Sequence, residues 1–197
     1  SLGYFLNPLV NVVAGLLMFQ ERLRPLQWVA VALAASGVLI SAISLGEIPL
    51  VGLILAFSFG IYGALRKLLT VEAVPGLFIE TLLLAPFALG YIAWLAALGE
   101  GQFATLSLST DLLLIGTGIV TAVPLLCYVA AARRLPISTV GMLFYLTPSG
   151  LFVLAALVYD EPVTQTDMIT FGFIWAGLLL FTLERQRHAR RMRETAI

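Results

Sequence analysis

SLGYFLNPLVNVVAGLLMFQERLRPLQWVAVALAASGVLISAISLG, residues 1–46, contains two uncharged runs, Ser1–Gln20 and Pro25–Gly46, on either side of a short charged turn. A helix that spans a membrane needs about 20 consecutive, mostly apolar residues. Both runs have that length, so we predict two spanning helices joined by a tight turn.

The rest of the chain repeats this alternation of apolar runs and short polar connections. Long continuous runs favour helices over the alternating strands of a membrane barrel. The sequence therefore predicts an all-α integral membrane fold with seven transmembrane helices. The last run is short unless residues 163–167 begin it. The five further runs are Ile48–Leu65, Gly76–Leu98, Leu112–Ala132, Leu135–Tyr159 and Met168–Leu183.

Composition gives the same class independently of the runs. The mean hydropathy is +1.02 and only 11% of residues are charged, whereas soluble domains carry about 25%. The lipid bilayer is therefore an expected partner. The formal net charge of zero argues against a nucleic-acid partner. The single cysteine, Cys127, excludes an internal disulfide, and we expect it to be a small buried side chain.

The basic residues predict the orientation. All 11 lysines and arginines follow the first, third, fifth and seventh runs, so seven spans place them on one side. The positive-inside rule makes that side cytoplasmic, with a cytoplasmic C-terminus. The basic tail 185–197 has two interpretations: a topological anchor, or a site for anionic lipid headgroups.

An internal repeat appears when the chain is compared with itself at an offset of 140 residues. Pro8 then aligns with Pro148, and Glu21 aligns with Glu161. We expect each glutamate to cap its own helix end. Gly37 also aligns with Gly177, and the small pair Ala32 and Ser36 aligns with Gly172 and Ala176; we expect that pair to allow close helix contacts.

The repeat divides the chain into segments 1–46, 47–184 and 185–197. The second segment is a complete unit of five helices, and the first holds the last two helices of such a unit. An odd number of spans inverts the units in the membrane, as in secondary transporters, and implies about 90 further residues upstream. The fold class is then the remainder of a ten-helix, 5+5 inverted-repeat transporter.

Four segments carry a resemblance to a known family: Leu2–Leu39, AFSFGIYGALRK (56–67), LFIETLLLAP (77–86) and GIVTAVPLLCYVAAARRLPISTVG (118–141). The chain resembles RarD-type permeases, of the EamA family in the drug/metabolite transporter superfamily. The resemblance implies ten helices and export of a small metabolite or drug across the inner membrane, in a family associated with chloramphenicol sensitivity. One departure is Phe144-Tyr145, where the family often has glutamine and tyrosine.

Polar side chains inside the runs are candidates for a substrate pathway. Asn7 and Asn11 share one helix face, with Tyr4 near it, and an unpaired amide in lipid is costly. Interhelical hydrogen bonding is the alternative role. The other pathway candidates are Ser58, Tyr62, Tyr145, Thr147 and Ser149.

Glu80 is the only acidic residue inside a run, which makes it a candidate proton site. Alternatively, it reaches the cytoplasmic interface near its helix N-terminus. Pro8 and Pro148 are hinge candidates, because each removes a backbone donor from a span.

Other functions fit the sequence less well. The only lysine, Lys67, lies at a helix end, which disfavours a retinal protein. The only histidine, His188, lies in the tail, so no Ser/His or zinc site is expected in the membrane, and the chain is not predicted to be an enzyme. We expect no cofactor and no metal. A channel-like or structural membrane subunit remains the alternative, and a homodimer is a candidate assembly.

Overall fold

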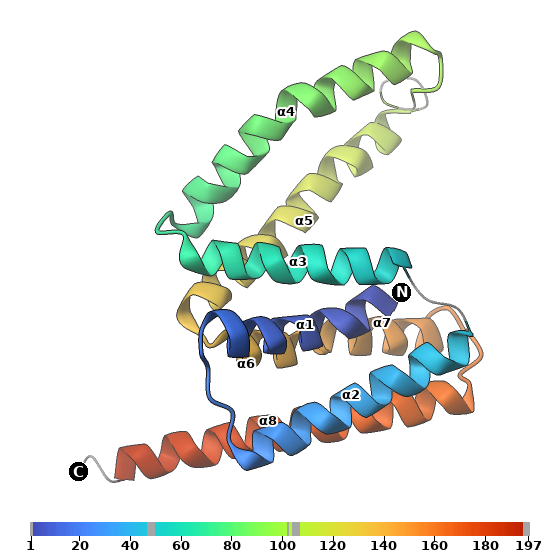
Figure 1. Cartoon of the computed structure of the whole chain (residues 1–197). Helices are drawn as coiled ribbons and strands as arrows, with labels where there is room; N and C mark the ends of the chain where they lie inside the picture. Colours follow the sequence, from blue (N-terminus) through green and yellow to red (C-terminus); the bar gives the residue numbers. More distant parts are fainter. Residues whose placement is uncertain (1, 47–49, 102, 104–106, 195–197) are drawn as a thin grey trace. The chain divides into compact units, whose positions relative to one another are not determined.

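The computed structural model describes residues 2–46, 50–101, 103 and 107–194, and all regular structure in these ranges is α-helical (Figure 1). Every predicted run is helical. The helices, in order, are α1 (Leu2–Met18), α2 (Pro25–Leu45), α3 (Leu50–Leu68), α4 (Ala73–Ala97), α5 (Leu108–Arg134), α6 (Ile137–Phe144), α7 (Leu146–Leu157) and α8 (Gln165–Glu194).

Six helices in the described part are long and apolar enough to cross a membrane, with α6 and α7 counted together as one span of 21 residues. The first predicted span, α1, has 17 residues. The last begins at Gln165 and continues to Glu194, so most of the expected basic tail extends the helix. The chain is therefore a multi-pass membrane protein.

The sixth predicted run is divided at Tyr145, where α6 ends and α7 begins. Pro148 accounts for this break. It lacks the N–H that would bond to the carbonyl of Phe144, and its ring is sterically opposed to that carbonyl. Pro8 occupies the same position in the repeat, yet α1 continues through it. The two hinge candidates therefore have different local structures.

The helices form two compact units. Residues 67–134, with α4 and α5, make one of them. There the Arg133 guanidinium donates a hydrogen bond to the carbonyl oxygen of Thr70 at 3.2 Å. Cys127 is exposed, so the expectation of a buried thiol is wrong. Two long helices shield only the strip where they meet, and the cysteine lies outside that strip.

The other unit combines residues 1–66 and 135–197, and its most extensive contact joins α2 to α8 (Figure 1). Two glycines permit this approach. A β-carbon on Gly37 would lie 2.7 Å from the carbonyl oxygen of Thr170, and one on Gly177 would lie 2.6 Å from that of Ala30. At Gly172 a β-carbon would meet nothing within 4 Å. The close contact therefore uses the Gly37/Gly177 pair rather than the small pair that contains Gly172.

Backbone geometry recurs at the 140-residue spacing within this unit. Gln20 and Asp160 are the two non-glycine residues with positive φ in the described ranges, at 51° and 49°. Each is followed by a glutamate whose N–H donates a 3.0 Å hydrogen bond to the sixth residue back, Gly15 or Ala155. Both helices that follow these turns also begin in the same way.

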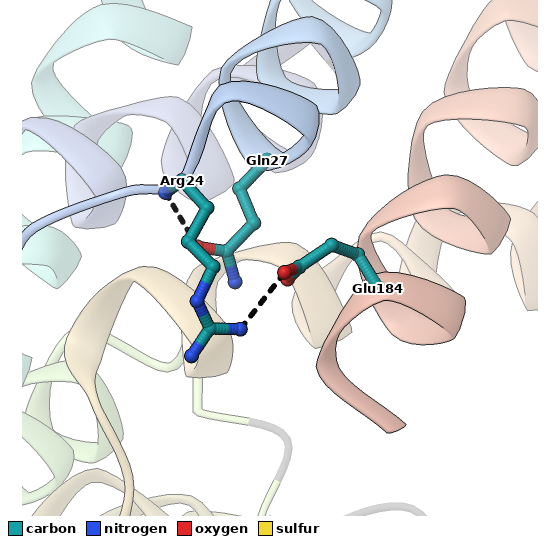
Figure 2. A network of polar contacts seen from close by, with 3 residues as sticks. All are labelled: Arg24, Gln27 and Glu184. Atoms are coloured by element: carbon teal, nitrogen blue, oxygen red, sulfur yellow. Dashed lines mark hydrogen bonds and ion pairs between the residues drawn. The ribbon is translucent and has the colours of Figure 1, made fainter. Parts of the chain in front are cut away.

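At the start of α2 the Arg24 N–H donates to Gln27 Oε1 at 3.0 Å, and at the start of α8 the Thr164 N–H donates to Asp167 Oδ2 at 3.0 Å. Figure 2 shows the first of these bonds beside an ion pair across the α2–α8 contact. The ion pair joins Arg24 Nη1 to Glu184 Oε1 at 2.8 Å.

Glu21 has a different role from the one expected. Its Oε1 accepts from the Ile137 N–H at 2.6 Å, and its Oε2 accepts from the Ser138 N–H at 3.0 Å. The glutamate therefore caps the N-terminus of α6, not an end of its own helix. The carboxylate is favoured there because unpaired amides and the helix dipole both attract negative charge.

Candidate functional site

A hollow of about 160 Å³ lies among α1, α3 and α6. Its walls are mostly apolar and aromatic, with one buried amide side chain. The hollow is lined by Gly3, Tyr4, Asn7, Leu55, Phe59 and Phe144.

Small residues bring α1 and α3 together around this hollow. A β-carbon on Gly3 would lie 3.1 Å from the carbonyl oxygen of Gly52, and one on Gly60 would lie 2.5 Å from Val10 Cγ1. Contacts as short as these require glycine, because a larger residue would force the helices apart. Glycine in these two helices therefore fixes the width of the hollow.

The polar part of the site comes from two asparagines. Asn7 is 4% exposed and Asn11 is fully buried, and Asn11 Nδ2 donates to Asn7 Oδ1 at 3.3 Å. Within the part of the chain that the structure describes, Asn11 Oδ1 accepts no hydrogen bond. The inner asparagine thus orients the outer one, which faces the hollow.

Phe144 is packed against Phe59, with ring centroids 5.7 Å apart. It is the residue that stands where the resembling family often has glutamine. Its phenyl group makes this wall of the hollow apolar, so a bound molecule would meet polar groups mainly on the α1 side.

Other predicted pathway residues lie elsewhere. Tyr145 is fully buried at the helix break. Ser149 Oγ donates to the carbonyl oxygen of Tyr145 at 2.7 Å and accepts from Trp175 Nε1 at 2.9 Å. These residues therefore hold the break between α6 and α7 against α8.

Three further candidates are separated from the hollow's lining. Ser58 and Thr147 are exposed. Tyr62 is half-buried, with its ring centroid 5.9 Å from that of Phe59. Glu80 is half-buried in α4 and belongs to the other compact unit. The structure groups Tyr4 and Asn7 in the hollow, with Asn11 behind them.

Sequence reasoning missed the aromatic wall. Leu55, Phe59 and Tyr62 are spaced four and three residues apart, which places them on one helix face. That spacing was a usable signal, but attention to polar residues favoured Ser58 instead. Contacts between Phe59 and Phe144, which are distant in sequence, carry no such local signal.

A second hollow, of about 360 Å³, gathers basic residues from two separate connections. Arg22 and Arg24 follow α1, whereas Arg185 and His188 belong to the last part of α8, and all four line this hollow. Basic groups from the first and the last basic clusters therefore lie at the same end of the helices in this unit.

Comparison with known families adds the decisive observation. Residues 48–183, more than half of the chain, match the model of the EamA-like transporter family. The chain belongs to this family. Its membrane-spanning helices and its aromatic hollow are thus those of an EamA-like protein.

Relatives of this EamA-like protein occur in several bacteria. It is 49% identical to an uncharacterized transporter of Vibrio cholerae and 46% identical to Protein RarD of Escherichia coli, in each case over 97% of this chain and 64% of the relative. It is 34% identical to the Chloramphenicol-sensitive protein RarD of Pseudomonas aeruginosa, over 100% of this chain and 65% of that protein.

The chain spans about 64% of the length of the curated relatives it matches. No solved structure matches it.

Proposed function

We propose that the full-length protein is a secondary transporter that exports a small molecule across the bacterial inner membrane, and that the hollow beside Asn7 is part of its substrate site. The observation that carries the proposal is a single buried amide among aromatic side chains in a member of a transporter family. Binding sites for small molecules are mostly apolar, with few polar groups that orient the ligand.

The proposed architecture has ten helices in two inverted units of five. Its support is the recurrence of turns, caps and glycine contacts at a spacing of 140 residues. The bounds of the family match, 48–183, also agree with a unit that covers residues 47–184. Inverted repeats place the substrate site where the two units meet.

The proposed orientation has a cytoplasmic C-terminus. The basic hollow supports it, because arginines from the turn after α1 and from α8 lie at one end of the helices. A reporter fused after Ile197 should be active only in the cytoplasm. Activity in the periplasm would reverse this orientation.

The substrate we propose is a small metabolite or drug of low polarity. Stacked aromatic walls and one amide would bind a flat, neutral or weakly polar molecule. A hollow of about 160 Å³ is smaller than the range of roughly 300–1,000 Å³ typical of ligand pockets. The upstream helices would then complete the site. The name of the Pseudomonas aeruginosa relative makes chloramphenicol a first compound to test.

We further propose Glu80 as the site that couples transport to protons. It is half-buried in a span, and carboxyl groups inside membranes often belong to proton pathways. Replacing Glu80 with Gln should abolish the dependence of flux on a proton gradient while leaving protein insertion unchanged. Unaltered coupling in this variant would exclude Glu80.

The test of the proposal uses full-length protein in liposomes. Saturable flux of a chloramphenicol-class compound or another screened metabolite is expected, and Asn7→Ala should reduce it at least about tenfold, since a lost hydrogen bond to substrate costs on the order of 1.4 kcal/mol. Ser58→Ala is the matched control, because Ser58 is exposed on α3 and does not line the hollow.

The alternative is a channel-like or structural membrane subunit. A channel would give flux that does not saturate with substrate concentration, whereas a structural subunit would give no flux above that of empty liposomes. Either result, with correctly inserted protein, would contradict the transporter proposal.

A further inference from the structure

One end of α7 presents a surface whose counterpart on α1 is already occupied. The α1 surface consists of Pro8, Asn11, Gly15 and Glu21, and α6 is packed on it. A β-carbon on Gly141 would lie 2.7 Å from the Pro8 carbonyl oxygen and 2.8 Å from Asn11 Cβ. At the other end of this contact, a β-carbon on Gly15 would lie 3.2 Å from the Ser138 nitrogen.

Glu21 completes that contact. Its two carboxylate oxygens accept three hydrogen bonds from Ile137 and Ser138, at 2.6 to 3.0 Å. The α6 helix therefore runs antiparallel to α1, with its first turn held by the glutamate.

Adding 140 to the α1 positions gives Pro148, Leu151, Ala155 and Glu161. Three of these, Pro148, Leu151 and Ala155, line a single hollow of about 200 Å³. The remaining lining residues are Tyr4, Phe5, Phe152 and Phe171. The hollow therefore lies beside the first turns of α1.

The turn after α7 presents Glu161 as the turn after α1 presents Glu21. Asp160 and Gln20 share a positive φ, and the two glutamate N–H groups make equivalent 3.0 Å bonds. Within the described ranges the Glu161 side chain is exposed and accepts no hydrogen bond.

The α2–α8 contact shows that such counterpart surfaces are used reciprocally. Gly37 approaches Thr170, and Gly177 approaches Ala30, which are exactly the positions related by 140 residues. A contact in which each residue and its counterpart exchange partners is the signature of a two-fold relation.

We propose that the Pro148–Leu151–Ala155–Glu161 surface is the docking site for the helical turn that directly precedes Leu2 in the full-length protein. The counterparts of Ile137 and Ser138 are the fourth and third residues before Ser1. Their backbone N–H groups donate to the Glu161 carboxylate, and this interaction closes the end of the bundle opposite to Glu21. The inference rests on the ten-helix architecture of the proposed function.

Cross-linking in the full-length protein tests this docking. All native cysteines, including Cys127, are replaced by serine. One variant carries Glu161→Cys and a cysteine at the third residue before Ser1. The reference variant carries Glu21→Cys and Ser138→Cys, and the negative control moves the first cysteine to Val163. A short bis-methanethiosulfonate reagent is added, and the linked peptides are identified by mass spectrometry.

The expected result is an intramolecular link in the Glu161 variant, with a yield within about twofold of the reference and well above the Val163 control. A link in the reference alone would overturn the proposal. A link only between two molecules would show that a second copy covers this surface, and would also overturn it. Because the readout needs no transport, its failure is distinguishable from a failure of the transporter proposal.

Hydrogen exchange provides a second measurement that needs no cysteines. The amides of the third and fourth residues before Ser1 should be protected, and Glu161→Ala should accelerate their exchange by about tenfold, the effect of losing one charge-assisted hydrogen bond. Glu161→Gln, which keeps an acceptor, should have a smaller effect. Equal exchange in all three proteins would refute the role of Glu161.

Discussion

Glu21 Oε2 accepts hydrogen bonds from both the backbone N–H and the hydroxyl of Ser138, at 3.0 and 2.6 Å, across 117 residues of sequence. Ser138 is 3% exposed, so water cannot easily replace the carboxylate. A charged acceptor at a buried helix N-terminus is stronger than a neutral one. This contact joins the turn after α1 to the first turn of α6.

We predict that Glu21→Ala destabilises the protein by about 1–3 kcal/mol, because buried donors on α6 lose their acceptor. Glu21→Gln should cost less, since its amide oxygen can still accept. The measurement is an SDS unfolding titration in mixed micelles, followed by circular dichroism.

Glu72→Ala is the control for Glu21. Glu72 is also a glutamate at a helix start, but its side chain makes no capping hydrogen bond to α4. Its replacement should shift the unfolding midpoint by less than about 0.5 kcal/mol, as is usual for exposed positions. Equal shifts for the two alanine variants would show that the Glu21 contact contributes nothing specific.

The glycines of the α2–α8 contact give a second prediction. Gly177→Ala should destabilise the protein by about 1–3 kcal/mol, because the new methyl group would overlap the Ala30 carbonyl oxygen and overpack the contact. Gly172→Ala in the same helix should be neutral or stabilising by up to about 1 kcal/mol, the helix propensity difference. Thermal unfolding in detergent compares the two variants.

This pair also separates packing from composition, because both substitutions are chemically identical and lie in one helix. A destabilised Gly172→Ala variant beside an unaffected Gly177→Ala variant would contradict the α2–α8 geometry. Gly37→Ala should behave like Gly177→Ala, since its β-carbon would meet the Thr170 carbonyl oxygen.

Hydropathy was sufficient to predict the helices of this fold, because a spanning helix depends on local composition. It was not sufficient to predict the break at Tyr145. Pro148 signals a disturbed helix, yet Pro8 leaves α1 continuous. Whether a proline breaks a helix depends on its neighbours, such as Ser149 and Trp175, which lie 26 residues apart.

The candidate site could be predicted only in part. Asn7 and Asn11 stood out as polar residues in an apolar run, and the structure places them together. Glu21 was recognised as a repeated residue but assigned to its own helix, because the α6 amides that it binds are far away in sequence. Contacts of that kind depend on tertiary packing, which helix periodicity does not report.

The Arg24–Glu184 ion pair (Figure 2) is predicted to contribute little. The arginine side chain is 38% exposed, and partly exposed pairs typically contribute about 0.2–1 kcal/mol. A double-mutant cycle with Arg24→Gln and Glu184→Gln should give a coupling energy in that range, which falls as salt is added. A coupling that salt does not weaken would show that the pair is shielded from solvent.

The final prediction concerns the helix break and tests the role of Pro148 as a hinge. Pro148→Ala restores an N–H that can bond to the Phe144 carbonyl oxygen, so α6 and α7 should join into one helix. Stability should stay the same or rise, because proline costs about 3 kcal/mol in a helix interior. In the full-length protein, flux should nevertheless fall severalfold, since Phe144 would no longer be free to change its place beside the hollow.

Two measurements separate a hinge from a simple packing kink. Spin labels at Leu143 and Leu157, in a protein without cysteines, report by electron–electron resonance whether the break has straightened. The distance between the two backbone positions should approach about 21 Å, the length of 14 helical residues. Pro86→Ala, in the exposed part of α4, is the control for removing a proline and should leave flux unchanged. If α6 and α7 straighten while flux stays at the wild-type level, Pro148 only shapes the helix and its hinge role is excluded.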